Sequence, residues 1–264
     1  MGDGQIALVD GQLLPADAAT LPVTDEGVLR GDAVFEVIRV YGGVPFALRE
    51  HLDRMSRSAA NLRLELDAGQ VEADLRTVLA ARGGDGLLRA IVTRGGHRLV
   101  LTEPLRDAAA PVTLQTIAYS PPRVLDQVKS VSYAANMLAT RLAREQDADD
   151  ALLVTPHGRV LEGPTFSVFL RIGDGPFLTP PLTDQVLDSI TRRIVLSLGL
   201  GAREGAITRD DLDEVSEGVA VSTTREVQPI GMIDRRPLPT VGGEWARAAL
   251  AAFRTRVQAE TGAS

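Results

Sequence analysis

Two adjacent prolines, Pro121 and Pro122, stand near the middle of the sequence and constrain its fold more than any other feature. Proline lacks an amide hydrogen and fixes its own φ angle, so a pair of prolines fits neither a helix interior nor a central strand. We therefore predict an N-terminal domain over residues 1–118, a linker over 119–127 and a C-terminal domain over 128–264. A chain of 264 residues is long enough to bury the core of two such domains.

The residues before the prolines predict a mixture of strands and helices. Short apolar runs around Asp10-Gly11 and around Gly42-Gly43 are typical of two β-hairpins. Apolar residues at three- and four-residue spacing predict an amphipathic helix over residues 49–64. A second helix is expected over 71–81, and further strands over 87–96 and 112–120.

The residues after the prolines continue this α+β pattern. A helix is expected to begin behind Asp188-Ser189 and to end at glycine near residue 201. Other helices are predicted over 132–146 and 244–260. Strands are predicted over residues 150–155, 158–163, 165–172 and 218–224.

Composition and charge exclude several functional classes. The net charge of −7 argues against a nucleic-acid or anionic-membrane partner, because both require clustered cations. No run approaches the roughly 20 apolar residues of a membrane span, and the first residues do not resemble a signal peptide, so a cytoplasmic location is expected. The absence of cysteine excludes disulfides and thiol catalysis. The three histidines are too scattered along the sequence to suggest a metal site.

Lys129 is the only lysine in the sequence, beside 27 arginines. A lysine amine can lose its proton and attack a carbonyl to form a Schiff base, whereas the guanidinium of arginine stays protonated in proteins. One interpretation is therefore that Lys129 has a catalytic role that arginine cannot take. The alternative is that high arginine usage has left one lysine by chance.

A Schiff-base cofactor such as pyridoxal phosphate needs further partners, because its phosphate requires hydrogen-bond donors and its pyridine nitrogen requires a carboxylate. Ser189–Thr191 open a predicted helix and Ser222–Thr224 end a predicted strand, so both runs offer donors. Glu162 precedes Gly163 in a predicted hairpin, where a half-buried carboxylate is unusual unless a positive group meets it. A helix cap or a turn would also explain each of these residues.

Together and in this order, the motifs resemble the class IV aminotransferases, which include branched-chain aminotransferases, D-amino-acid aminotransferases and aminodeoxychorismate lyases. The resemblance runs from about Asp25 to Asp234, through GDAVFEVIRVYGG, HLDRMSRSA, KSVSYAANMLA, DDALLVTPHGRVLEGPTFSVF, FLTPPL, LDSITRRIV and VSTTREVQPI. It implies pyridoxal phosphate as cofactor and a two-domain α+β fold like that of D-amino-acid aminotransferase, with a smaller α/β N-terminal domain and a larger C-terminal pseudo-barrel domain. It also implies a homodimer, because family members build each active site from two subunits.

The resemblance assigns roles to individual residues. Lys129 matches the Schiff-base lysine, which also moves a proton between the substrate and the cofactor. Glu162 matches the acid that pairs with the pyridine nitrogen. Tyr133 is similar to a tyrosine near the cofactor's 3-oxygen, although a packing role would also explain it. The residues that match the family's phosphate-binding groups are Arg54, Ile190, Thr191 and Thr223.

The substrate pocket is less clearly defined by the sequence. Arg30 stands where branched-chain and D-amino-acid enzymes carry an aromatic residue, so we hypothesise that Arg30 or Arg39 binds a substrate carboxylate. A surface or interface salt bridge is the alternative. Phe35, Val37 and Arg39 alternate along one predicted strand and should share its inner face. Two further substrate-binding candidates are Arg98, in a segment that resembles the carboxylate-binding segment of D-amino-acid enzymes, and Thr224.

These assignments predict transamination between an amino acid, of the branched-chain or D-amino-acid type, and a 2-oxo acid. An aminodeoxychorismate lyase, which would release 4-aminobenzoate and pyruvate, is the alternative on the same fold. The lyases usually have a threonine near position 36 or 37, where this sequence has Glu36-Val37. Many family members have an asparagine where this sequence has Ser167. A non-catalytic small-molecule-binding relative is a more remote alternative, because it would not need to keep Lys129 and Glu162.

Overall fold

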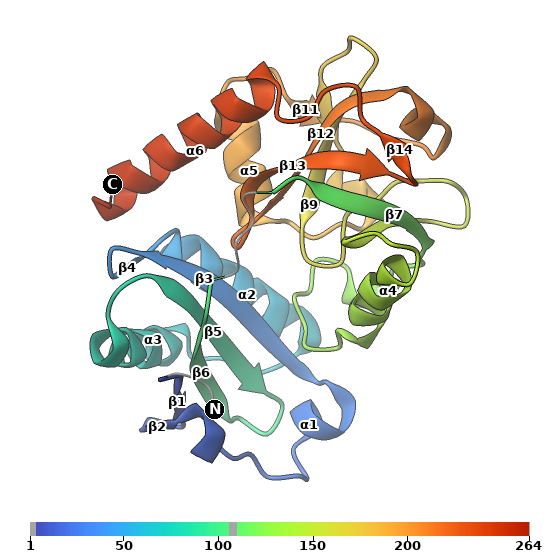
Figure 1. The fold of residues 1–264 in the computed structure, drawn as a ribbon. Coiled ribbons are helices and arrows are strands. Elements are labelled where there is room, and N and C mark those ends of the chain that lie inside the picture. The colour runs from blue at the N-terminus through green and yellow to red at the C-terminus, as the bar shows by residue number, and fades with distance from the viewer. Residues whose placement is uncertain (1–3, 106–109, 264) are drawn as a thin grey trace. The chain divides into compact units, whose positions relative to one another are not determined.

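The computed structural model describes residues 4–105 and 110–263, which divide into two compact units (Figure 1). Unit 1 contains residues 4–105, 128–133 and 257–263, and unit 2 contains residues 110–127 and 134–256. The predicted boundaries differ from these ranges in three places. Residues 110–118 lie in unit 2 instead of the N-terminal domain, and residues 128–133 and 257–263 lie in unit 1 instead of the C-terminal domain.

The described residues of unit 1 form an antiparallel sheet with the strand order β2-β1-β6-β5-β3-β4. Asp10 and Gly11 turn the first hairpin, and both have positive φ angles (48° and 86°), as a tight hairpin turn requires. The strands are β1 (Ile6–Val9), β2 (Gln12–Pro15), β3 (Ala33–Tyr41), β4 (Val44–Pro45), β5 (Gly86–Thr93) and β6 (Arg98–Glu103).

Two helices of unit 1, α2 (Leu48–Leu62) and α3 (Ala68–Arg82), lie alongside this sheet (Figure 1). Met55 of α2, Leu75 of α3 and Ile38 of β3 are buried in the same hydrophobic core. Because side chains alternate along a strand, the even-numbered residues of β3 face these helices and the odd-numbered residues face the opposite side. A short helix, α1 (Glu26–Arg30), precedes β3 and is capped by the Asp25 carboxylate.

The described residues of unit 2 form a larger sheet with the strand order β11-β10-β9-β12-β13-β7-β8, and β14 pairs with β13. β7 pairs in parallel with both β8 and β13, so its two partners come from distant parts of the sequence. The strands are β7 (Val112–Ala118), β8 (Asp150–Val154), β9 (Ser167–Ile172), β10 (Phe177–Thr179), β11 (Arg203–Glu204), β12 (Val215–Ser222), β13 (Glu226–Ile233) and β14 (Arg236–Pro237).

Helices α4 (Ala134–Arg144) and α5 (Ile190–Ser197) lie within unit 2, and α6 (Glu244–Thr261) begins there. Ser189 caps α5 by accepting a hydrogen bond from the Arg192 amide. Trp245 of α6 stacks on Phe177 of β10 with ring centroids 3.8 Å apart. Short 3₁₀ helices occupy Ala16–Ala18, Arg123–Leu125, Leu182–Asp184 and Asp210–Glu214.

Most predicted elements are present, and the mixed α+β fold is confirmed. One strand prediction is wrong: residues 158–163 contain only isolated bridges, at Arg159 and Val160, and Glu162 lies outside the regular strands. Pro164 follows this segment and cannot donate to a ladder. Pro121 and Pro122 lie outside every helix and strand, as predicted. Among the residues that the structure describes, no helix has both the length and the hydrophobicity needed to cross a membrane.

Candidate active site

Lys129 lies in a short segment of unit 1 that pairs with the first residues of β3. The Lys129 carbonyl accepts a hydrogen bond from the Phe35 amide (3.1 Å), and the Lys129 amide donates to the Ser58 hydroxyl of α2 (3.1 Å). Ser130 forms an antiparallel bridge with Val34. A strand and a helix therefore fix the backbone that carries the only lysine.

The Lys129 amine lies against aromatic rings. Its Nζ atom is 4.3 Å from the centroid of the Phe35 ring and 5.7 Å from that of the Tyr133 ring. These two rings meet edge to face, with centroids 5.2 Å apart. The structure thus brings three predicted site residues, Lys129, Phe35 and Tyr133, into one cluster within unit 1.

A buried group of ionisable side chains lies between β3 and α2, and sequence reasoning missed that they meet. Glu36 is 1% exposed and accepts hydrogen bonds from Arg54 Nε (2.7 Å) and Nη2 (2.6 Å). His51 Nδ1 lies 2.7 Å from the same carboxylate. We call Glu36, His51 and Arg54 the α2 charge cluster. Its sequence signal was an acidic residue at a core-facing position of the apolar strand AVFEVIRV.

The α2 charge cluster holds each of its groups in a defined charge state. Burial alone would raise the pKa of Glu36, but the charge and hydrogen bonds of Arg54, together with His51, hold that pKa well below its usual range. Burial lowers the pKa of His51, and this effect, with the positive charges of Arg54 and Lys129, exceeds the raising effect of Glu36. His51 is therefore neutral at neutral pH, and its Nδ1–H donates to the Glu36 carboxylate.

Arg54 was predicted to bind the cofactor phosphate. In the structure it is buried, and two nitrogens of its guanidinium bind Glu36 as a fork. The phosphate-binding role of Arg54 stays a prediction. The observed pairing adds that Glu36 orients this guanidinium.

Phe35, Val37 and Arg39 follow the predicted alternation along β3. Their odd numbers place them on the face that points away from α2 and α3. The Arg39 guanidinium lies 4.5 Å from the centroid of the Tyr41 ring. The guanidinium of Arg89 in β5, which pairs with Glu103, lies 5.1 Å from the centroid of the Phe35 ring.

The other two arginines proposed for the substrate have partners elsewhere in unit 1. Arg30 is 72% exposed at its side chain and pairs with Glu26 one turn earlier in α1, at 2.6 Å. Arg98 Nε donates to Asp74 of α3 at 2.8 Å. Neither of these ion pairs involves the Lys129 cluster, and the substrate roles of Arg30 and Arg98 stay predictions.

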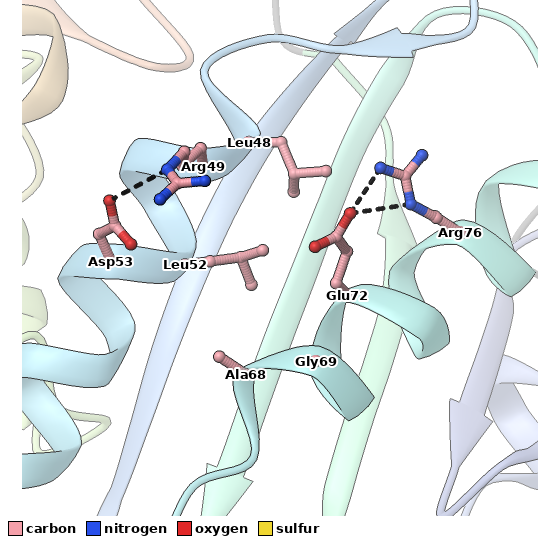
Figure 2. A pocket seen from close by; sticks show the side chains of 8 residues that line it. All are labelled: Leu48, Arg49, Leu52, Asp53, Ala68, Gly69, Glu72 and Arg76. Atoms are coloured by element: carbon pink, nitrogen blue, oxygen red, sulfur yellow. Dashed lines mark hydrogen bonds and ion pairs between the residues drawn. The ribbon is translucent and has the colours of Figure 1, made fainter.

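A pocket of roughly 410 Å³ lies between α2 and α3 (Figure 2). It is lined by apolar side chains such as Leu48 and Leu52 and by the ion pair between Glu72 and Arg76. It contains none of the predicted site residues. We therefore do not assign the chemistry to this pocket.

Glu162 lies in unit 2, and its backbone is held beside β8. Its carbonyl accepts a hydrogen bond from the Leu153 amide (2.9 Å), and its carboxylate Oε1 accepts one from the Leu187 amide (2.9 Å). Burial, and then the negative charge of Glu162, raises the pKa of Tyr119. The carboxylate is thus fixed by a backbone donor and is close enough to Tyr119 to affect its ionisation.

The predicted phosphate-binding residues of unit 2 lie at a helix start and in a turn. Ile190 and Thr191 are both buried in the first turn of α5, behind the cap at Ser189. Thr223 and Thr224 belong to the turn between β12 and β13, where Thr224 Oγ1 lies 3.2 Å from Ser222 Oγ. A helix N-terminus and turn hydroxyls are suitable donors for a phosphate.

Comparisons with known proteins identify the family of this chain. The family model described as amino-transferase class IV matches residues 33–233. A putative branched-chain-amino-acid aminotransferase of Methanocaldococcus jannaschii is 31% identical over 256 residues, which cover 86% of this chain and 88% of that protein. A D-alanine aminotransferase of Bacillus licheniformis is also 31% identical, over 257 residues that cover 86% of this chain and 88% of the relative.

Solved structures support the same assignment. The branched-chain aminotransferase of Thermoproteus uzoniensis, solved with norvaline, matches with a TM-score of 0.88 at 26% identity, over 98% of this chain and 96% of that chain. Another branched-chain amino acid aminotransferase, which matches with a TM-score of 0.85, was solved in complex with N-(5'-phosphopyridoxyl)-L-glutamate. The half-buried lysine, the fixed carboxylate and the capped helix start are the chemical groups that pyridoxal phosphate requires. The chain belongs to the class IV aminotransferases and is a pyridoxal-phosphate-dependent enzyme.

Proposed function

We propose that this enzyme moves an amino group between an amino acid, of the branched-chain or D-amino-acid type, and a 2-oxo acid, and that Lys129 is its catalytic lysine. The observation that carries the proposal is the environment of Lys129. Its backbone is fixed by Phe35 and Ser58, and its amine rests on two aromatic rings. A catalytic amine must reach the same reacting atom in every catalytic cycle, so a backbone that is held in one position favours the reaction.

The side chains divide the chemistry between them. Bound pyridoxal phosphate supplies an electron sink for the electron pair that remains on the substrate α-carbon when its proton leaves. The Lys129 amine is the group proposed to bind the cofactor covalently, to take that proton and to return it. The Glu162 carboxylate would keep the pyridine nitrogen protonated, and the Leu187 amide would hold that carboxylate in place.

The phosphate is assigned to donors of both kinds, backbone and side chain. We propose that the first turn of α5, at Ile190 and Thr191, and the hydroxyl of Thr223 donate to it. Arg54 would add a positive charge while Glu36 orients its guanidinium. Tyr133 is assigned to the cofactor's 3-oxygen, and its ring packs on Phe35.

Among the arginines considered for the substrate carboxylate, Arg39 has the most suitable place. It lies on the same face of β3 as Phe35, against whose ring the Lys129 amine rests. Arg30 is exposed and paired within its own helix, and Arg98 is paired with Asp74. We expect Arg39→Ala to raise the KM for the amino donor about tenfold, a loss of about 1.4 kcal/mol. Arg30→Ala is the matched control and should leave KM unchanged. An increased KM in Arg30→Ala with an unchanged KM in Arg39→Ala would assign the substrate carboxylate to Arg30 instead.

Two experiments test the function. Borohydride reduction of the holoenzyme followed by peptide mapping should label Lys129, and a label at any other position would overturn the assignment. Incubation with L- and D-amino acids and with aminodeoxychorismate should then identify the reaction. Conversion of the cofactor to its aminated form marks a transamination donor and its handedness, whereas release of 4-aminobenzoate would mark a lyase.

We also propose that the enzyme is a homodimer in the cytoplasm. The large apolar side chains of Val23, Val28 and Leu29 are more than half exposed near α1, a grouping that is typical of interaction surfaces. Light scattering of the purified protein measures the assembly directly. A monomer at micromolar concentration would contradict the proposed dimer.

A further inference from the structure

The turn that carries Thr223 is joined to the segment that carries Glu162 by two side chains, Arg225 and Phe166. Arg225 is the last residue of the 223–225 turn between β12 and β13. Its guanidinium carbon lies 4.6 Å from the centroid of the Phe166 ring. Phe166 is 3% exposed and stands immediately before β9, at the end of the segment that begins with Glu162.

The Phe166 ring lies directly on the residue that follows Glu162. A Cβ atom at Gly163 would come within 2.1 to 2.4 Å of three atoms of that ring, so only glycine leaves room for it. The Gly163 amide also donates to the Phe166 carbonyl at 2.8 Å. The backbone next to the Glu162 carboxylate is therefore held between a tight turn and an aromatic face.

The Arg225 guanidinium is held in place on its other sides. Its Nη2 donates to the buried carboxylate of Asp150 in β8 at 2.8 Å, and its Nη1 donates to Gln228 of β13. Thr140 of α4 donates to the second oxygen of Asp150 at 2.8 Å. A planar guanidinium can serve these partners and stack on a ring at the same time, whereas a lysine ammonium cannot.

We propose that Arg225 and Phe166 form a positioning pair that fixes the 223–225 turn relative to the Glu162 segment. The pair would hold the Glu162 carboxylate and the Thr223 hydroxyl, both in unit 2, at a constant distance from each other. This inference rests on the cofactor roles proposed above for Glu162 and Thr223. Neither Arg225 nor Phe166 needs to touch the cofactor, so both act through the residues they hold.

The test is a double-mutant cycle on cofactor affinity in the full-length chain. Arg225→Lys keeps the positive charge beside Asp150 but removes the stack, and Phe166→Leu keeps an apolar side chain over Gly163 but removes the ring. We expect each variant to raise the Kd for pyridoxal phosphate about tenfold, because a desolvated cation–π contact is of that size. In the double variant the Kd for pyridoxal phosphate should also rise by no more than about tenfold, because both substitutions remove the same contact.

A control is the ion pair between Arg254 of α6 and Glu226, the first residue of β13. Arg254 Nε pairs with the buried Glu226 at 2.9 Å, as Arg225 pairs with Asp150, but this ion pair involves neither Thr223 nor Phe166. Arg254→Lys should keep the wild-type Kd. The melting temperature of each apoprotein separates weakened cofactor binding from a general loss of stability. Wild-type Kd values in both single variants, or losses that multiply in the double variant, would overturn the proposal.

A further variant separates this inference from the proposed function. Glu162→Gln should alter the absorption spectrum of the bound cofactor and its dependence on pH, because the pyridine nitrogen loses its carboxylate. An unchanged spectrum would contradict the role of Glu162 itself. An altered spectrum together with wild-type Kd values for Arg225→Lys and Phe166→Leu would contradict only the positioning pair.

Discussion

The two units hold their candidate site residues in different ways. In unit 1, Arg54 and Glu36 come from a helix and a strand and are joined by a buried ion pair. In unit 2, Glu162 and Thr223 lie outside regular elements. The Glu162 carboxylate accepts a hydrogen bond from the Leu187 amide, and the stack of Arg225 on Phe166 is proposed to fix the turn that carries Thr223. The difference predicts that unit 1 is sensitive to the loss of a charge and that unit 2 is sensitive to a change of shape.

The largest effect is expected at Lys129, where the amine itself does the chemistry. Lys129→Ala should lower kcat about 1,000-fold or more, because a general base is lost together with the covalent attachment point. Stopped-flow absorbance with an accepted amino donor measures the loss. Ser58→Ala is the control, because it removes the hydrogen bond to the Lys129 backbone and keeps the amine, so kcat should decrease far less. Similar decreases in kcat in the two variants would contradict a chemical role of the Lys129 amine.

Removal of Glu36 should be the largest stability effect in unit 1. Glu36→Ala leaves the Arg54 charge buried and unpaired, which should cost about 3–5 kcal/mol of unfolding free energy. Urea denaturation measures this loss. Glu103→Ala is the matched control, because Glu103 also pairs with an arginine, Arg89, but both side chains are about one quarter to one third exposed. That pair should contribute at most about 1 kcal/mol, and equal losses would contradict the comparison.

Acid should weaken unit 1 through the same cluster. The folded pKa values of His51 and Glu36 both lie below their ordinary values of 6.5 and 4.5, so the unfolded chain binds more protons as the pH falls. The stability contribution of His51 should be complete above pH 6.5 and decrease below it, and that of Glu36 should decrease below about pH 4.5. Unfolding free energies measured from about pH 7.5 to about pH 4 test this sign. His51→Gln should flatten the upper part of the profile, and a profile that rises on acidification would contradict it.

The smallest effect tests the shape dependence of unit 2. Gly163→Ala forces a methyl group into the Phe166 ring and should cost about 1–3 kcal/mol of stability. Gly69→Ala in the first turn of α3 is the control, because its new methyl group would meet no atom closer than 3.3 Å and should be neutral or slightly stabilising. Thermal melting distinguishes the two variants. A neutral Gly163→Ala would show that the turn has more freedom than its packing indicates.

Local signals predicted most of the secondary structure, and distant contacts accounted for the errors. The Asp10-Gly11 turn, the cap at Ser189 and the apolar spacing of α2 are each readable within a few residues. The position of β7 in the sheet cannot be predicted from neighbouring residues, because its partners are β8 and β13, which follow much later in the chain. The diproline therefore marked an irregular segment correctly but did not mark where unit 1 ends.

The candidate site was predictable by residue type more than by arrangement. Lys129 and Glu162 were selected because their chemistry is unusual where they occur in the sequence. The pairing of Glu36 with Arg54 was missed because sequence alone does not show which strand face meets which helix face. The stack of Arg225 on Phe166 was missed for a similar reason, since its two residues lie far apart in the sequence and sequence alone does not show that their segments meet.

The short pairing between Ser130 and Val34 limits how this enzyme can be divided or rearranged. The chain leaves unit 2 after Gln127, contributes six residues to unit 1 and returns to unit 2 at Ala134. A split version cut at Pro121-Pro122 would give one fragment an incomplete β3 edge and the other fragment a lysine without its scaffold. A permuted or two-piece enzyme would have to keep residues 128–133 together with β3, and the new ends would be better placed in another loop.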